Sequence, residues 1–250
     1  MSKLILSITP IPAFKDNYIW IISTASGAIV IDPGDAKPVI KYLKKHQLKC
    51  IAILITHHHY DHIGGVDELY RYDSNILIYG PKDLNLKSPV RQLPLNIEIA
   101  NITFRIIPIP GHTLDHVAYY DGDHLFVGDT LFSGGCGRVF EGTHQQMLES
   151  LDTLCQLPNS TKIYCAHEYT YQNLCFAKSV EPDNKHIDQY MDWVSKNVIS
   201  LPSTLAKEKS INPFLRLNQS TIHQSIQDKC PDPASRLNVF STLRTLKDEF

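Results

Sequence analysis

The stretch Cys50–His62, CIAILITHHHYDH, joins an apolar run to a cluster of four histidines and one aspartate. The apolar run is short, continuous and rich in β-branched residues, which is typical of a buried strand. If the extended backbone continues past the run, side chains alternate sides, so that His57 and His59 point one way and His58 the other. The stretch therefore predicts a strand whose end presents several imidazoles.

This cluster contains more donors than one metal ion uses. Four imidazoles crowded together without a metal would leave several ring nitrogens without hydrogen bonds, which favours a metal site. A single zinc-like ion takes about four ligands and needs an open position to be catalytic. His57, His59, Asp61 and His62 could therefore serve two ions, with further ligands from elsewhere in the chain.

Three later β-type runs end in side chains that could supply those ligands. The runs IIPIPGHT, HLFVGDT and KIYCAHEYT contain His112, Asp129 and His167. Loops at strand ends are where a rigid sheet positions functional groups. A lone histidine such as His167 is by itself more often a hydrogen-bonded structural residue. Asp129 is the expected bridge, because a carboxylate has two oxygens and can bind two cations at once.

The composition limits the kinds of partner. The chain has 250 residues and a net charge of −2, with no block of five or more like charges. This balance favours a small-molecule partner over nucleic acid or a membrane surface. No stretch approaches the ~18–20 apolar residues of a membrane span, and the first residues lack a signal-peptide pattern. We expect a cytoplasmic protein, with its six cysteines as free thiols.

The character of the chain changes near residue 169. From residue 4 to about 166, short β-type runs alternate with helical patterns at 37–46, 63–72 and 143–157, the last with Thr143 as its expected N-cap. Beyond that point the patterns are helical, and the last helix is expected to start at Asp232, with that residue as its N-cap. We therefore predict an α/β catalytic domain over 1–168 and a helical domain over 169–250.

The motifs together resemble those of a known superfamily. T-H-x-H-x-D-H at 56–62, G-H-T at 111–113, G-D-T at 128–130 and A-H-E-Y-T at 166–170 resemble the metallo-β-lactamase superfamily. Within it, KDNYIW, LFSGGCGR, PSTLAKEKSINPFLR and the terminal RTLKDEF resemble the glyoxalase II, or hydroxyacylglutathione hydrolase, family. The likeness runs nearly from end to end.

The resemblance implies an αββα sandwich with a C-terminal helical domain and a site for two divalent metal ions per chain. Zinc is the first choice, with iron and manganese open, because imidazole and carboxylate donors suit all three. Asp61 and Asp129 are the implied catalytic carboxylates. The implied ligands of one ion are His57, His59 and His112, those of the other are Asp61, His62 and His167, and Asp129 bridges the two.

The implied reaction is hydrolysis of the thioester S-D-lactoylglutathione to D-lactate and glutathione, the second step of methylglyoxal detoxification, by a hydroxide activated between two metals. A thiolate leaving group makes little demand for a protein acid, because thiols titrate near ~8.5. The family positions that contact glutathione correspond here to Arg138, Tyr169, Arg244 and Lys247. Without the resemblance, the last two would be interpreted as a solvated helix face. A monomer is expected.

Two differences from some family members concern the glutathione site. Arg138 stands where some members have lysine, and Phe140 where some have tyrosine. Arginine keeps the charge but changes the geometry of the contact, and phenylalanine lacks the hydroxyl. These differences affect the expected affinity for glutathione, while all seven ligand positions are present.

Other functions of the same fold are open alternatives. A metal-dependent phosphodiesterase or nuclease would be expected to carry a basic surface, which the balanced charge disfavours. A one-iron sulfur dioxygenase should lack ligands of the second site, whereas Asp61, His62 and His167 are present. A metal-buffering protein would not need the basic pair Arg244 and Lys247. The number of bound metals per chain separates the last two from the thioester hydrolase.

Overall fold

The computed structural model describes residues 7–82 and 84–250, and the chain forms two compact units that alternate along the sequence. Of the described residues, unit 1 comprises those within 1–107 and 115–122, and unit 2 comprises 108–114 and 123–250. The predicted start of the first strand at residue 4 lies outside the described residues. The predicted domain boundary between residues 168 and 169 divides the chain differently and stays a prediction.

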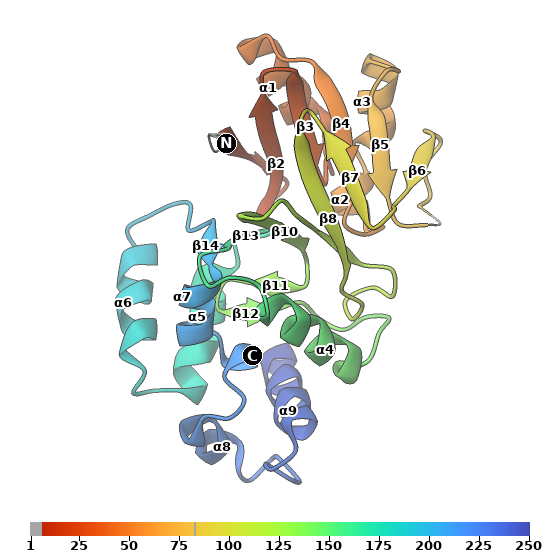
Figure 1. The fold of residues 1–250 in the computed structure, drawn as a ribbon. Helices are drawn as coiled ribbons and strands as arrows, with labels where there is room; N and C mark the ends of the chain where they lie inside the picture. The colour runs from red at the N-terminus through yellow and green to blue at the C-terminus, as the bar shows by residue number, and fades with distance from the viewer. Residues whose placement is uncertain (1–6, 83) are drawn as a thin grey trace. The chain divides into compact units, whose positions relative to one another are not determined.

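Unit 1 is built on a six-stranded sheet with the order β1-β2-β3-β4-β5-β6 (Figure 1). The pairs β1/β2 and β2/β3 are antiparallel, and the pairs from β3 to β6 are parallel. Unit 1 also contains three paired strands of another sheet, in the order β9-β8-β7. The elements are β1 Ser7–Ala13, β2 Asn17–Thr24, β3 Gly27–Ile31, α1 Ala36–His46, β4 Cys50–Leu54, α2 Tyr60–Ile63, α3 Val66–Tyr72, β5 Leu77–Gly80, β6 Val90–Gln92, β7 Asn96–Ile99, β8 Ile102–Pro108 and β9 Val117–Tyr120.

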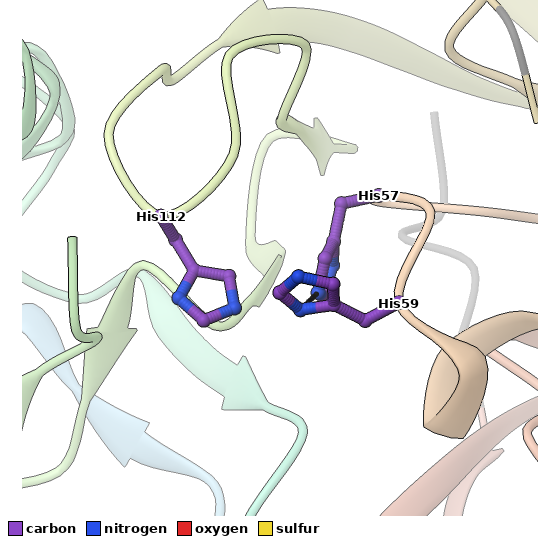
Figure 2. A group of neighbouring side chains, drawn as sticks. All are labelled: His57, His59 and His112. Atoms are coloured by element: carbon purple, nitrogen blue, oxygen red, sulfur yellow. Dashed lines mark hydrogen bonds between the residues drawn. The ribbon is translucent and has the colours of Figure 1, made fainter. Parts of the chain in front are cut away.

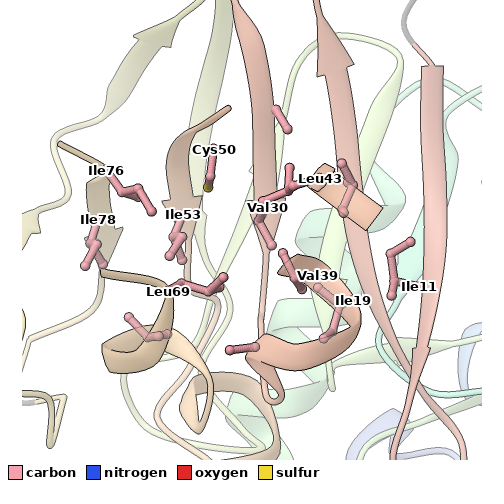
Figure 3. Close-up of a cluster of buried hydrophobic side chains, with 14 of the residues drawn as sticks. Ile11, Ile19, Val30, Val39, Leu43, Cys50, Ile53, Leu69, Ile76 and Ile78 are labelled. Atoms are coloured by element: carbon pink, nitrogen blue, oxygen red, sulfur yellow. The ribbon is translucent and has the colours of Figure 1, made fainter. Parts of the chain in front are cut away.

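The core of unit 1 lies between this sheet and its helices. Figure 3 shows Ile19, Val30 and Ile53 from the sheet beside Val39 of α1 and Leu69 of α3. Strands β3 and β4 are almost wholly buried, as expected for parallel strands covered by helices. The apolar run that begins at Cys50 is therefore a central strand, and a packed core holds its end.

The helix predicted over 63–72 is wrong in its extent. The structure has two short helices here, α2 and α3, with Gly64 and Gly65 between them. A Cβ on Gly64 would lie 2.7 Å from the carbonyl oxygen of Gly34, and one on Gly65 would lie 2.4 Å from the nitrogen of Ala36. The break exists because another backbone segment passes close to these glycines.

Unit 2 contains three strands in the order β14-β13-β10, a small β11/β12 hairpin and most of the helices (Figure 1). Strands β10 and β13 are parallel, and β13 and β14 are antiparallel. The elements are β10 His124–Gly128, β11 Leu131–Phe132, β12 Gly135–Cys136, α4 His144–Cys155, β13 Lys162–Cys165, α5 Thr170–Val180, α6 Lys185–Val194, β14 Ser203–Thr204, α7 Leu205–Ile211, the 3₁₀ turn η1 Pro213–Leu215, α8 Ser220–Ile226 and α9 Arg236–Glu249.

The helices of unit 2 pack through apolar faces. Leu174 and Ala177 of α5 meet Ile187 and Tyr190 of α6 and Ile211 of α7. Among residues 7–82 and 84–250, no helix combines the length and hydropathy that crossing a membrane requires.

Two helix starts test the capping predictions. Thr143 caps α4 as expected, in a capping box with Gln146. The predicted cap at Asp232 is wrong, because α9 begins at Arg236 and Ser235 is its N-cap. Asp232 instead accepts a hydrogen bond from the nitrogen of Ala234 at 3.0 Å, which forms a local turn before the helix.

Candidate active site

His57 and His59 form a pair on the loop after β4. Nε2 of His57 lies 3.1 Å from Nδ1 of His59, and both side chains leave the same side of the loop (Figure 2). Nδ1 of His58 instead lies 3.5 Å from the Asp115 carboxylate. The predicted separation of His58 from this pair is confirmed. Strand β4 ends at Leu54, so the side chains of these histidines alternate between two sides of the loop that follows it. The ring of His116 stacks on His57, with centroids 4.6 Å apart.

The buried carboxylate of Asp32 orients His62. Oδ2 of Asp32 lies 3.0 Å from Nδ1 of His62, and Thr56 donates to Asp32 from its nitrogen and from its hydroxyl, both at 2.7 Å. With Nδ1 donating to Asp32, the lone pair of the imidazole is on Nε2, as a metal ligand requires. Sequence reasoning missed Asp32, although it follows β3 as directly as the predicted ligands follow their strands.

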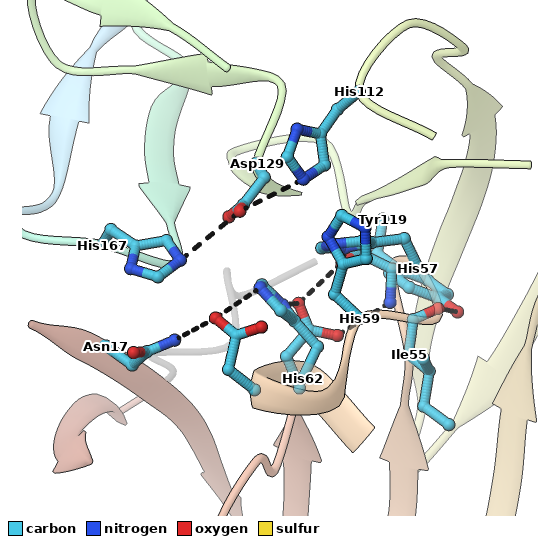
Figure 4. Close-up of polar contacts among 12 residues, drawn as sticks. Asn17, Ile55, His57, His59, His62, His112, Tyr119, Asp129 and His167 are labelled. Carbon is cyan, nitrogen blue, oxygen red and sulfur yellow. Dashed lines mark hydrogen bonds and ion pairs between the residues drawn. The ribbon is translucent and has the colours of Figure 1, made fainter. Parts of the chain in front are cut away.

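The Asp61 carboxylate lies beside the other ring nitrogen of His62. Oδ2 of Asp61 is 3.5 Å from Nε2 of His62 and accepts a hydrogen bond from the side-chain amide of Asn17 at 2.8 Å (Figure 4). Sequence reasoning also assigned no role to Asn17, although this residue lies in the KDNYIW motif. Unit 1 thus brings together His57, His59, Asp61 and His62.

Unit 2 brings together the other three predicted ligands. Figure 4 shows Asp129 between His112 and His167. Oδ2 of Asp129 is 3.5 Å from Nε2 of His112 and 3.4 Å from Nε2 of His167. All three side chains are buried, so their donors face one another away from bulk water.

These distances fit donors around a cation better than hydrogen bonds. Nitrogen-to-oxygen hydrogen bonds are usually about 2.7–3.2 Å long. Two ligand atoms about 2.1 Å from one ion in tetrahedral geometry lie about 3.4 Å apart. The separations of 3.4 and 3.5 Å at Asp61 and Asp129 match the second value. Imidazole and carboxylate donors of this kind form a candidate site for a divalent metal ion.

Neighbouring groups fix the rings of the two histidines in unit 2. Nδ1 of His112 donates to the carbonyl oxygen of Arg138 at 2.8 Å, which directs the Nε2 lone pair toward Asp129. The ring of Tyr169 stacks on His167, with centroids 4.7 Å apart and an interplanar angle of 6°. The resemblance assigns Arg138 and Tyr169 to the substrate, and here both also touch a candidate ligand.

A cavity of about 900 Å³ in unit 2 joins these groups to the predicted substrate contacts. Three of its lining residues are cationic, Arg138, Arg244 and Lys247, and we call them the cationic wall. Burial, and then the positive charge of Arg244, lower the pKa of Lys247. The remaining lining residues include His112, Asp129, Phe132, Cys136, Phe140, Tyr169, Asn173, Cys175, Asp248 and Phe250.

Arg244 is buried in the wall of this cavity rather than solvated. Its side chain is only 3% exposed, and Nη1 donates to the carbonyl oxygen of Cys136 at 2.7 Å. Its guanidinium also lies 5.2 Å from the ring centroid of Phe214. Despite Arg244, burial raises the pKa of the Cys136 thiol, so this cysteine is a poor nucleophile at neutral pH.

Side chains from the C-terminal half of unit 2 hold the loop at 132–136. The buried carboxylate of Glu208 accepts from the nitrogen of Gly134 at 2.8 Å and from the hydroxyl of Ser133 at 2.9 Å. Asn212 donates to the carbonyl oxygens of Phe132 and Gly135, at 3.2 and 2.9 Å. This loop follows Asp129 and leads to Arg138, so α7 indirectly supports both ends of the site.

Comparisons with known proteins agree with this geometry. Residues 14–167 match the model of the metallo-beta-lactamase superfamily, and residues 168–250 match that of the hydroxyacylglutathione hydrolase C-terminus. Hydroxyacylglutathione hydrolases of Vibrio campbellii and Photobacterium profundum are 47% and 48% identical, over 98% of this chain and 100% of theirs. The chain belongs to the hydroxyacylglutathione hydrolase family.

Solved structures show the same fold at lower identity. The B3 metallo-beta-lactamase BLEG-1 covers 84% of this chain and matches over 99% of its own, with 24% identity and a TM-score of 0.63. ETHE1 from Myxococcus xanthus covers 98% of this chain and matches over 100% of its own, with 23% identity and a TM-score of 0.64. These structures confirm the predicted metallo-β-lactamase fold. The hydroxyacylglutathione hydrolase family adds the C-terminal region that supplies Tyr169, Arg244 and Lys247.

Proposed function

We propose that this protein hydrolyses the thioester of S-D-lactoylglutathione, and of related 2-hydroxyacylglutathiones, to a 2-hydroxy acid and glutathione. One observation carries the proposal: a single cavity is lined both by candidate metal ligands, His112 and Asp129, and by the cationic wall. Glutathione has two carboxylates that cations can bind. Hydrolysis of its thioester needs a group nearby that polarises the carbonyl oxygen, as a metal ion does. The names of the relatives support the same reaction.

We further propose that the site holds two divalent ions, with zinc as the first choice. One would be held by His57, His59 and His112, the other by Asp61, His62 and His167, and Asp129 would bridge them. When bound, such ions lower the pKa of water and polarise a carbonyl oxygen. The donor set supports this assignment, because it contains seven imidazoles and carboxylates and no thiolate.

The protein's own groups would orient the reaction. Asp32, the carbonyl oxygen of Arg138 and the ring of Tyr169 fix the imidazoles of His62, His112 and His167. Arg138 and Lys247 can bind a carboxylate of the tripeptide through charge-assisted hydrogen bonds. The departing thiolate is stable enough near neutral pH that no protein acid has to donate to it.

We also propose a cytoplasmic monomer with a catalytic region over 1–168 and a glutathione-binding region over 169–250. The six free cysteines support a reducing compartment. The lining of the cavity supports separate catalytic and glutathione-binding regions. Its candidate metal ligands precede residue 168, while Arg244 and Lys247 follow it.

The test combines metal analysis with an assay. Protein with quantified metal should contain two ions per chain and should consume S-D-lactoylglutathione, followed by the loss of thioester absorbance. Removal of the metal with a chelator should abolish the activity, and zinc should restore it. Protein that holds two metals per chain and leaves the thioester intact would refute the proposed function, whereas one iron per chain would favour the dioxygenase alternative.

A further inference from the structure

Asp248 lies among the three cations of the cavity wall. Its Oδ1 accepts a hydrogen bond from Nη2 of Arg244 at 2.9 Å and lies 3.2 Å from Nε of Arg138. Lys247 precedes it in α9. Asp129 and Asp248 are the two acidic residues among the described residues that line the cavity, and Asp129 is a candidate metal ligand. Asp248 is therefore the counter-charge of the cationic wall.

The location of Asp248 is unfavourable by local rules. It occupies the last turn of α9, where the negative end of the helix dipole repels an anion. Its ion pair with Arg138 is exposed to water, with side-chain exposures of 59% and 41%, and such pairs add little to folding stability. Folding stability therefore does not explain the pair with Arg138, whereas the pair with the buried Arg244 gives that cation a partner. Both pairs place the carboxylate beside the cations proposed to bind the substrate.

Asp248 already occupies the donors that a ligand carboxylate would seek. Nη1 of Arg244 is engaged by the carbonyl oxygen of Cys136, and Nη2 is engaged by Asp248. Nε of Arg244 is buried and has no hydrogen-bond partner among the described residues, but it is shielded from the cavity. An incoming carboxylate that approaches Nη2 of Arg244 or Nε of Arg138 therefore meets the negative charge of Asp248, and it gains the positions held by Oδ1 only by replacing that oxygen.

We propose that Asp248 is an internal counter-anion that competes with the substrate carboxylate for Arg138 and Arg244, and so sets the affinity for anionic thioesters. The inference rests on the proposed function. An exchange of one carboxylate for another leaves neither arginine without an anion, before binding or after release. Asp248 thus weakens binding of the substrate and of the glutathione product alike, which favours product release.

The substitution Asp248→Asn tests this directly. Asparagine has nearly the same shape and retains an oxygen acceptor for the arginines, but it lacks the charge. The KM for S-D-lactoylglutathione should fall about fivefold, the scale of one partly exposed charge pair. The kcat/KM for the uncharged thioester S-lactoyl-N-acetylcysteamine should stay unchanged. Calorimetry should show a parallel fivefold fall in the Kd of S-methylglutathione, which cannot be hydrolysed.

Glu249→Gln is the matched control. Glu249 is the exposed next residue of α9 and has no ion pair among the described residues, so its loss removes the same charge without freeing an arginine. Its KM should equal that of the wild type. An equal fall in both variants would show a general charge effect and overturn the inference. An unchanged or higher KM in Asp248→Asn would also overturn it, since Asp248 would then be irrelevant or would hold the arginines for the substrate.

The two proposals fail in different ways. Wild-type protein that holds metal and binds S-methylglutathione, but does not hydrolyse the thioester, refutes the function and leaves the Asp248 comparison measurable by calorimetry. Wild-type protein that hydrolyses the thioester, with no gain in affinity in Asp248→Asn, refutes only the role of Asp248.

Discussion

The candidate metal ligands and the cationic wall are supported in opposite ways. Four of the candidate ligand rings contact a second group through Nδ1 or a ring face, and that contact directs or steadies the remaining ring nitrogen; they are His57, His62, His112 and His167. The cations of the wall instead share a carboxylate, Asp248, that competes with their ligand. The first arrangement strengthens binding, while the second moderates it. A resident cofactor has to be retained, whereas a substrate has to leave.

The substitution with the largest expected effect removes the centre of the metal site. Asp129→Ala should reduce bound metal and lower kcat/KM by about 10³-fold, because the ions supply several kcal/mol of transition-state stabilisation. Elemental analysis and the thioester assay measure both effects. His58→Ala is the control, since His58 faces Asp115 rather than His57, and it should retain its metal. Equal metal loss in both variants would contradict the ligand assignment.

An intermediate effect is expected from the carboxylate behind His62. Asp32→Asn should weaken metal affinity by about 10- to 100-fold, because the imidazole loses the charged partner that raises its basicity. Asparagine also tolerates the positive φ of 51° at this position, so the fold should persist. Competition with a chromogenic chelator measures the affinity, and urea unfolding of the metal-free protein checks the fold. An unchanged affinity would show that Asp32 serves the backbone of Thr56 alone.

The smallest of the three effects belongs to the cationic wall. Lys247→Ala should raise the KM for the glutathione thioester about tenfold with kcat nearly constant, as expected for the loss of one charge-assisted hydrogen bond. Steady-state kinetics on the glutathione and N-acetylcysteamine thioesters separates the two constants. Lys229→Ala removes an exposed lysine outside the cavity and should leave KM unchanged. A fall in kcat on both thioesters would place Lys247 in the support of the site instead.

The difference between the two regions also explains what could be read from the sequence. The fold and the family could be predicted, and the candidate ligands could be proposed, because each of these residues follows a β-type run and lies in a short motif. Asp32 also directly follows a β-type run, the one that forms β3, so its place near the candidate ligands could have been predicted in the same way. Glu208 and Asp248 lie within quoted motifs, but those motifs do not reveal that their partners Gly134 and Arg138 are about 75 and 110 residues away in the chain. The break at Gly64 was missed because it depends on a backbone segment that passes nearby.

The hydrogen bonds that hold the loop at 132–136 have a consequence for biosynthesis. Its anchors are Asn173, Glu208, Asn212 and Arg244, which bind Ser133, Gly134, Gly135 and Cys136 in turn. Proteins are made from the N-terminus, and segments fold as they emerge. Arg244 leaves the ribosome long after Asp129. The nascent chain therefore displays all of its candidate metal ligands before the segment beside Asp129 has the anchors that give it its final shape.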